Sequence, residues 1–72
     1  MNRYRNLGGN SGVAGYQINT TSITIQFSGN YKLYTYSYGK AGQVHVDNMK
    51  VLATQGRGLN AYIKKHVNNL YD

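Results

Sequence analysis

The fold of this chain is decided by residues 22–38, which read SITIQFSGNYKLYTYSY. Large side chains alternate with small polar ones from Ile23 to Phe27 and again from Tyr34 to Tyr38. Successive side chains of a strand point to opposite faces, so each run predicts a strand. The turn Ser28-Gly29-Asn30 between the runs is too short for a parallel crossover, which predicts an antiparallel pair.

The residues before this hairpin predict one more strand and an arm. Residues 13–18 read VAGYQI and form the first strand, and Asn19-Thr20 offers a turn into the second. The three strands are therefore expected to form an antiparallel meander. Residues 1–12 hold glycines, asparagines, Arg3 and Arg5 with little to bury, which predicts a flexible basic arm with a hinge at residues 8–12.

After residue 42 the apolar spacing changes to that of helices. Met49, Leu52 and Ala53 define the first helix, with either Val46 or Val44 one turn earlier. Gly56 and Gly58 then interrupt the chain. The second helix follows from an apolar stripe with spacings of three and four: Leu59, Tyr62, Ile63, His66, Val67, Leu70 and Tyr71.

These elements predict an α+β fold of order β-β-β-α-α, a three-stranded antiparallel meander followed by two helices packed on one face. Residues 13–72 form its single domain. Either the Ile23–Phe27 side chains or the tyrosines face the helices, depending on strand register. A 72-residue chain without cysteine has a small core and no disulfide, which favours a homo-oligomer.

Composition points to an anionic partner and away from catalysis. Eight Lys and Arg residues stand against Asp47 and Asp72, a balance that attracts polyanions. No carboxylate pair is available for acid–base catalysis, and His45 and His66 lack the spacing of a metal site. His66, set among apolar residues, is expected in the core or an interface. We therefore expect no enzyme, no metal and no cofactor.

Three clusters are candidate ligand sites, each with a plainer alternative. Tyr34, Tyr36 and Tyr38 form one stripe that stacks on bases, with Lys32 and Lys40 at its ends, or else walls the core. The Gly56–Asn60 segment opens the second helix, where Arg57 and backbone amides bind phosphate, or it merely connects two helices. Arg3 and Arg5 of the arm contact a nucleotide, or they form a solvated tail.

A family resemblance covers residues 11–71. The residues that carry it are, in order, Gly15-Tyr16, Ile23-x-Ile25-x-Phe27, Gly29, Tyr34-x-Tyr36, Ala53-x-x-Gly56, Asn60 and Ile63. Together they resemble the KTSC domain, named for the C-terminal extension of some lysyl-tRNA synthetases and found also as short free-standing bacterial and phage proteins. The chain departs from the family pattern in three places: it has Thr54 where serine is usual, it lacks a proline after Tyr36, and its Gly39–Gly42 connection is glycine-rich. The resemblance implies a binding domain, for which RNA binding has been suggested.

We therefore expect non-catalytic binding of a phosphate-bearing ligand, a nucleotide or short single-stranded nucleic acid. One specific form is a phage-type sponge that sequesters a nucleotide immune signal, acting in anti-defence. An RNA-binding accessory domain is one alternative, and a homo-oligomeric interaction module with the tyrosine face as its interface is another. No apolar run suggests a membrane span or signal peptide, so the expected location is the cytoplasm of a bacterial host cell.

Overall fold

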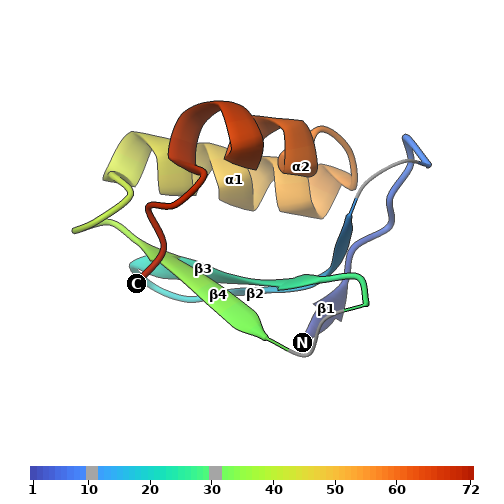
Figure 1. Cartoon of the computed structure of the whole chain (residues 1–72), viewed down its shortest axis with the longest axis horizontal. Helices are drawn as coiled ribbons and strands as arrows, with labels where there is room; N and C mark the ends of the chain where they lie inside the picture. Colours follow the sequence, from blue (N-terminus) through green and yellow to red (C-terminus); the bar gives the residue numbers. More distant parts are fainter. Residues whose placement is uncertain (10–11, 30–31) are drawn as a thin grey trace.

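The computed structural model describes residues 1–9, 12–29 and 32–72. An antiparallel sheet forms one layer of the molecule and two consecutive helices form the other (Figure 1). Asn10 and Ser11 of the expected hinge, and Asn30 and Tyr31 of the expected turn and strand, lie outside the described residues.

Four strands follow one another across the sheet in chain order. They are β1 (Asn2–Arg3), β2 (Val13–Ile18), β3 (Ser22–Phe27) and β4 (Leu33–Ser37), and each pairs antiparallel with the next. The expected meander is confirmed for β2 to β4. The additional strand, β1, extends it at one edge.

The first residues of the chain are therefore part of the fold, and the prediction of a flexible arm was wrong for them. Asn2 pairs with Tyr16 in the sheet, and the Tyr4 amide donates a hydrogen bond to the carbonyl of Ala14 at 3.0 Å. The Tyr4 ring is only 3% exposed. Burying a ring of this size stabilises a small domain by several kcal/mol, at about 25 cal/mol per Å² of apolar surface, and this holds β1 in place.

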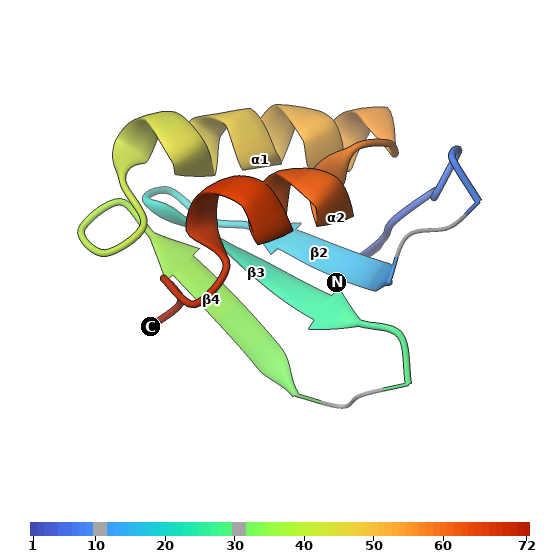
Figure 2. The same cartoon turned by 45° about the horizontal axis from the view of Figure 1, so that its top comes forward.

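Both helices cover the same face of the sheet (Figure 2). α1 spans Gln43–Gln55 and α2 spans Leu59–Tyr62, which continues into the π-helical turn η1 at Ile63–Val67. Of the two valines considered for the start of α1, Val46 is buried and Val44 is 72% exposed.

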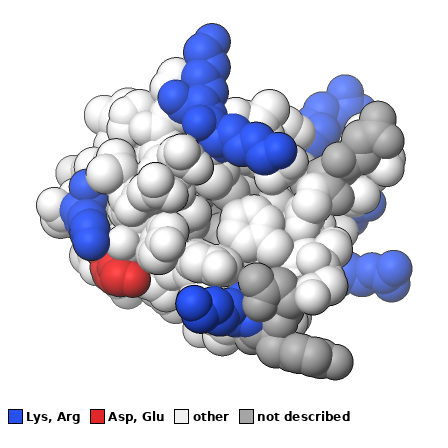
Figure 3. Space-filling model, viewed as in Figure 1, with Lys and Arg blue, Asp and Glu red and all other residues white. Residues whose placement is uncertain are grey.

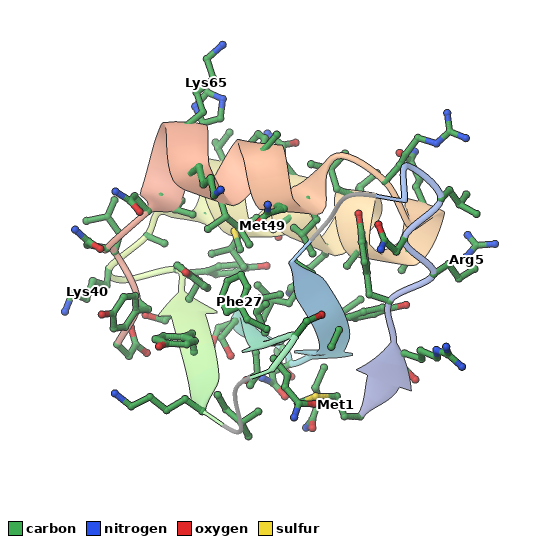
Figure 4. All side chains as sticks on the ribbon, turned by 45° about the vertical axis from the view of Figure 1, so that its right-hand side comes forward. Met1, Arg5, Phe27, Lys40, Met49 and Lys65 are labelled. Carbon is green, nitrogen blue, oxygen red and sulfur yellow. The ribbon has the colours of Figure 1, made fainter. Side chains whose placement is uncertain are left out.

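The core lies between the sheet and the helices α1, α2 and η1. Ile23 is opposite Tyr36 and Ile25 is opposite Tyr34, and paired residues of neighbouring strands share a face. The isoleucines and the tyrosines consequently both face the helices. The sequence left open which of these two sets faces inward, and the structure shows that both do. Met49 of α1 reaches into this layer, and Phe27 lies at its margin (Figure 4).

The opposite face of the sheet is mostly polar, although the exposed Leu33, paired with Gln26, also lies on it. It presents Gln17, Ser22, Thr24, Gln26, Thr35 and Ser37. The hydroxyls of Thr24 and Thr35 lie 2.9 Å apart in a cross-strand hydrogen bond. Among the residues that the structure describes, no helix has the length and apolar character that crossing a membrane requires.

Candidate functional site

The tyrosine stripe of β4 is divided by its surroundings. Tyr36 lies beneath the second helix with 1% of its surface exposed, and its hydroxyl donates to the carbonyl of Asn68 at 3.4 Å. Its ring has no free face for a base, so the prediction of Tyr36 as a stacking residue was wrong. A dimer interface through this ring is equally ruled out, because the chain's own helices cover it.

Burial also changes the acidity of Tyr36. Desolvation, followed by the neighbouring phenols of Tyr71 and Tyr34, raises the pKa of the Tyr36 phenol to about 12. A buried phenolate would lie in low dielectric, so the neutral form is favoured. Tyr36 therefore acts as a neutral part of the core.

Tyr38, at the other end of the stripe, belongs to a polar network with α1. Its hydroxyl donates to Asp47 Oδ1 at 2.6 Å and accepts from Lys50 Nζ at 3.3 Å. The ammonium of Lys50 also lies 5.0 Å from the centre of the Tyr38 ring. The Tyr38 hydroxyl and the Lys50 ammonium are therefore engaged in contacts within the protein.

A cavity lies between β4 and the second helix. Its volume is about 480 Å³, within the range of about 300–1,000 Å³ that small-molecule sites occupy. Its lining comes from the ends of β2 and β3, from β4, and from the helix and the residues after it: Gly12, Phe27, Ser28, Tyr34, Tyr36, Asn60, Ile63, Lys64, Asn68, Asn69 and Tyr71. We call it the main cavity.

One wall of the main cavity is aromatic. The Tyr34 ring is half-buried, with its centre 5.4 Å from that of Phe27 and 4.8 Å from that of Tyr71. Both neighbours meet it edge to face, the geometry that aromatic pairs prefer. The three rings thus brace one another at the border of the core.

The other wall is polar. Asn60 and Lys64 extend from the second helix and Asn69 from the residues after it. Within residues 1–9, 12–29 and 32–72, the side chains of these three residues form no hydrogen bond or ion pair with other described residues. Two amides and one ammonium are thus available to a guest beside the aromatic wall.

A smaller cavity of about 180 Å³ adjoins the N-terminal segment, and we call it the minor cavity. It is lined by Tyr4, Asn6, Gly8, Arg57, Gly58, Asn60 and Ala61. Asn60 therefore lines both cavities, and Arg57 lines only this one.

The segment before α2 is held by the start of the chain. The Leu59 amide donates to the Tyr4 hydroxyl at 3.3 Å, the Leu7 amide donates to the Gly56 carbonyl at 2.7 Å, and Arg5 donates to the Thr54 carbonyl at 2.7 Å. The Leu59 amide, which the sequence suggested as a phosphate donor, is consequently already engaged. The Gly56–Gly58 segment connects the two helices, and of its expected phosphate-binding groups Arg57 and Gly58 line the minor cavity.

The predicted site residues are only partly brought together. Tyr34, Tyr36 and Asn60 line the main cavity, and Arg57 lines the minor one. Arg5 and Lys40 point away from the interior on different sides of the molecule (Figure 4), and Arg3 is exposed on β1. Tyr38, Lys32, Arg3, Arg5 and Lys40 line neither cavity.

The basic side chains accordingly form no single patch on the face seen in Figure 3. Lys and Arg stand around its margin, and its centre is uncharged. β4 and the second helix, which border the main cavity, lie on this near side of the molecule in Figure 1.

Sequence reasoning missed Phe27, Lys64, Asn69 and Tyr71 as site residues. Lys64 has no role in the sequence-based prediction, although its spacing of four from Asn60 places the two on one side of a helix. That spacing was a usable signal. The sequence gives no such signal for Phe27 and Tyr71, because they join the site only through tertiary packing.

A second polar cluster lies on the outer side of the helices. His45 Nδ1 is 2.8 Å from the Tyr62 hydroxyl, which also accepts from Asn48 Nδ2 at 3.1 Å. His66 stacks on His45 with ring centres 5.3 Å apart. His66 was expected in the core or an interface, and because it is exposed the core alternative was wrong. Within the described residues no group of three or more His, Cys, Asp or Glu side chains is arranged to hold a metal ion.

A scan against protein-family models, a search of curated proteins and a search of solved structures each found no match for this chain.

Proposed function

We propose that this protein binds a phosphate-bearing aromatic ligand, a nucleotide or short single-stranded nucleic acid, in the main cavity. The observation that carries the proposal is that Asn60, Lys64 and Asn69, whose side chains have no partner among the described residues, line the same cavity as Tyr34 and Tyr71. Ligand sites combine an apolar surface with a few well-placed polar groups in this way.

Each wall suits one part of a nucleotide. Tyr34 and Tyr71 offer aromatic surface to a base, and base–aromatic contacts are worth about 1–3 kcal/mol each. The amides of Asn60 and Asn69 match the donor and acceptor pattern of a base edge. Lys64 supplies the charge for a phosphate.

Charge and resemblance support the same ligand class. The net charge of +6 favours the approach of an anion to any part of the surface. The resemblance to the KTSC domain, for which RNA binding has been suggested, agrees with a nucleotide-bearing ligand.

We propose that the ligand is bound and not chemically changed. The chain has only two carboxylates, and Asp47 accepts the hydrogen bond of Tyr38 while Asp72 accepts that of Ser37 at 2.7 Å. Neither lines the main cavity. A small binding protein of this kind acts by sequestration, and a phage sponge for a nucleotide immune signal is the specific form we favour.

The test is a binding titration with nucleotides and labelled oligonucleotides at two salt concentrations. The Lys64→Ala variant should bind about tenfold more weakly, because a hydrogen bond to a charged group is worth about 1.5–3 kcal/mol. Lys65→Ala is the matched control, since it removes the same charge from the adjacent residue, whose side chain points away from the sheet (Figure 4).

Two results would contradict the proposal. One is the absence of any binding at low salt. The other is an equal loss of affinity in Lys64→Ala and Lys65→Ala, which would mean that only overall charge matters. Recovery of the ligand as a changed product would overturn its non-catalytic part.

A further inference from the structure

Asn60 separates two cavities of different size and chemistry. The main cavity, at about 480 Å³, is aromatic and amide-lined, whereas the minor cavity, at about 180 Å³, is bordered by Arg57 and by the backbone of two glycines, Gly8 and Gly58. The first volume suits a nucleotide. The second falls below the range of about 300 Å³ and more that drug-sized ligands need, so it suits a smaller group.

The minor cavity is suited to a phosphate. Arg57 is exposed and forms no hydrogen bond or ion pair with another residue of the described segments. A guanidinium binds phosphate through two parallel hydrogen bonds. The adjoining glycines add no side chain that would keep a phosphate from the backbone.

The cations that line the two cavities lie on either side of Asn60 along the chain. Lys64 follows Asn60 by four residues, one helical turn, and lines the main cavity. Arg57 precedes Asn60 by three residues and lines the minor cavity. A ligand that contacts both cations must cross Asn60, whose amide has no partner within the described residues.

We propose that the ligand contains two linked nucleotides, with one base and its phosphate in the main cavity and the second phosphate at Arg57. This inference rests on the proposed nucleotide-binding function and extends it to the ligand's length. A mononucleotide fills the main cavity and leaves Arg57 unused. A dinucleotide engages both cations.

The experiment compares each of the four 5′-mononucleotides with the matching 5′-phosphorylated homodinucleotide by calorimetric titration. For the preferred base, the dinucleotide should bind at least about tenfold more tightly, the value of one charge-assisted contact. In Arg57→Gln this gain should disappear while mononucleotide affinity stays within about twofold. The matched control is Arg3→Gln, which removes an exposed arginine from β1 and should retain the gain.

The salt dependence gives a second reading that does not rely on absolute affinity. Loss of one phosphate contact lowers the slope of log K against log salt by about 0.7 for a single strand. The slope for the dinucleotide should fall by this amount in Arg57→Gln and stay unchanged in Arg3→Gln. Thermal unfolding of both variants checks that the fold is intact.

The outcomes separate the two proposals. If no nucleotide binds, the proposed function fails and this inference fails with it. If mononucleotides bind in a Lys64-dependent manner and dinucleotides gain nothing, only the inference is overturned. An equal loss of mononucleotide and dinucleotide affinity in Arg57→Gln would also overturn it.

Discussion

Tyr36 links the chemistry of one residue to the stability of the whole protein. The pKa of its phenol is raised to about 12 by burial and by the nearby phenols of Tyr71 and Tyr34. The folded state therefore favours the neutral phenol more than the unfolded state does, whose ordinary pKa is about 10. Below pH 10 this contribution to stability is fully present, and it is lost as the pH rises toward 12.

We expect the free energy of unfolding to fall by about 2–3 kcal/mol between pH 10 and 12 on account of Tyr36 alone. Urea unfolding at several pH values measures it. Tyr36→Phe is the control, because it keeps the ring and removes the ionisable group, and its decline over this range should be smaller by that amount. Identical declines in the two proteins would contradict the assignment.

Tyr4 tests whether the N-terminal segment belongs to the core. Its ring is 3% exposed and its hydroxyl accepts the Leu59 amide. Replacing a buried aromatic ring by alanine costs about 3–5 kcal/mol, so Tyr4→Ala should be strongly destabilised in chemical denaturation. Arg3→Ala, at an exposed neighbouring position, should stay within about 0.5 kcal/mol of the parent protein. A Tyr4→Ala protein as stable as Arg3→Ala would show that the segment is not anchored.

Tyr4 also shows where prediction from sequence stops at the residue scale. Its neighbours are arginine, asparagine and glycine, and their average composition indicates a solvated arm. A single aromatic residue without apolar neighbours at regular spacing gives no sequence signal of burial. The burial of Tyr4 depends on tertiary structure, because its ring fills the space between α2 and β2.

At the scale of elements, the α1–α2 connector depends on Gly56. Its φ of 78° lies in the left-handed region, and a Cβ there would come within 2.9 Å of Arg5 Cβ. Gly56→Ala should therefore lose about 1–2 kcal/mol, seen as a lower melting temperature. Gly39→Ala is the control, since a Cβ at Gly39 meets no atom within 4 Å and its φ is not positive. Equal melting temperatures for the two variants would contradict this role.

Strands were predicted better than helix ends. The alternation from Ile23 to Phe27 predicts a strand regardless of what the strand packs against. Which side chains of β4 share a face with it depends on the register between the two strands. The second helix was expected to reach Tyr71, yet η1 ends at Val67 and Asn68 takes a positive φ of 23°. Leu59, Ile63 and Val67 are the buried residues, and their spacing of four does not distinguish an α-helical from a π-helical turn.

At the scale of the whole molecule, the main cavity explains why the candidate site was only partly predictable. Tyr34 and Asn60 were chosen from local patterns, one on a strand and one at a helix start. Their meeting requires α2 to lie across β4, and Tyr71 joins them only because the chain turns back after η1. No pattern within one element contains that information.

A domain of this size has a limited core, and we propose that it self-associates. Native mass spectrometry of protein taken from cells should show a dimer or larger assembly, together with any nucleotide that co-purifies. A monomeric mass at every protein concentration tested would contradict the proposed self-association.

The contacts of Tyr4, Arg5 and Leu7 with the α1–α2 connector join positions as far apart as 55 residues. β2, β3 and β4 leave the ribosome before Leu59, so the hairpins can close while the Tyr4 hydroxyl still lacks the Leu59 amide that donates to it. Nascent chains arrested upstream of Leu59 should consequently be digested by protease, and resistance should arise abruptly once α2 has left the exit tunnel.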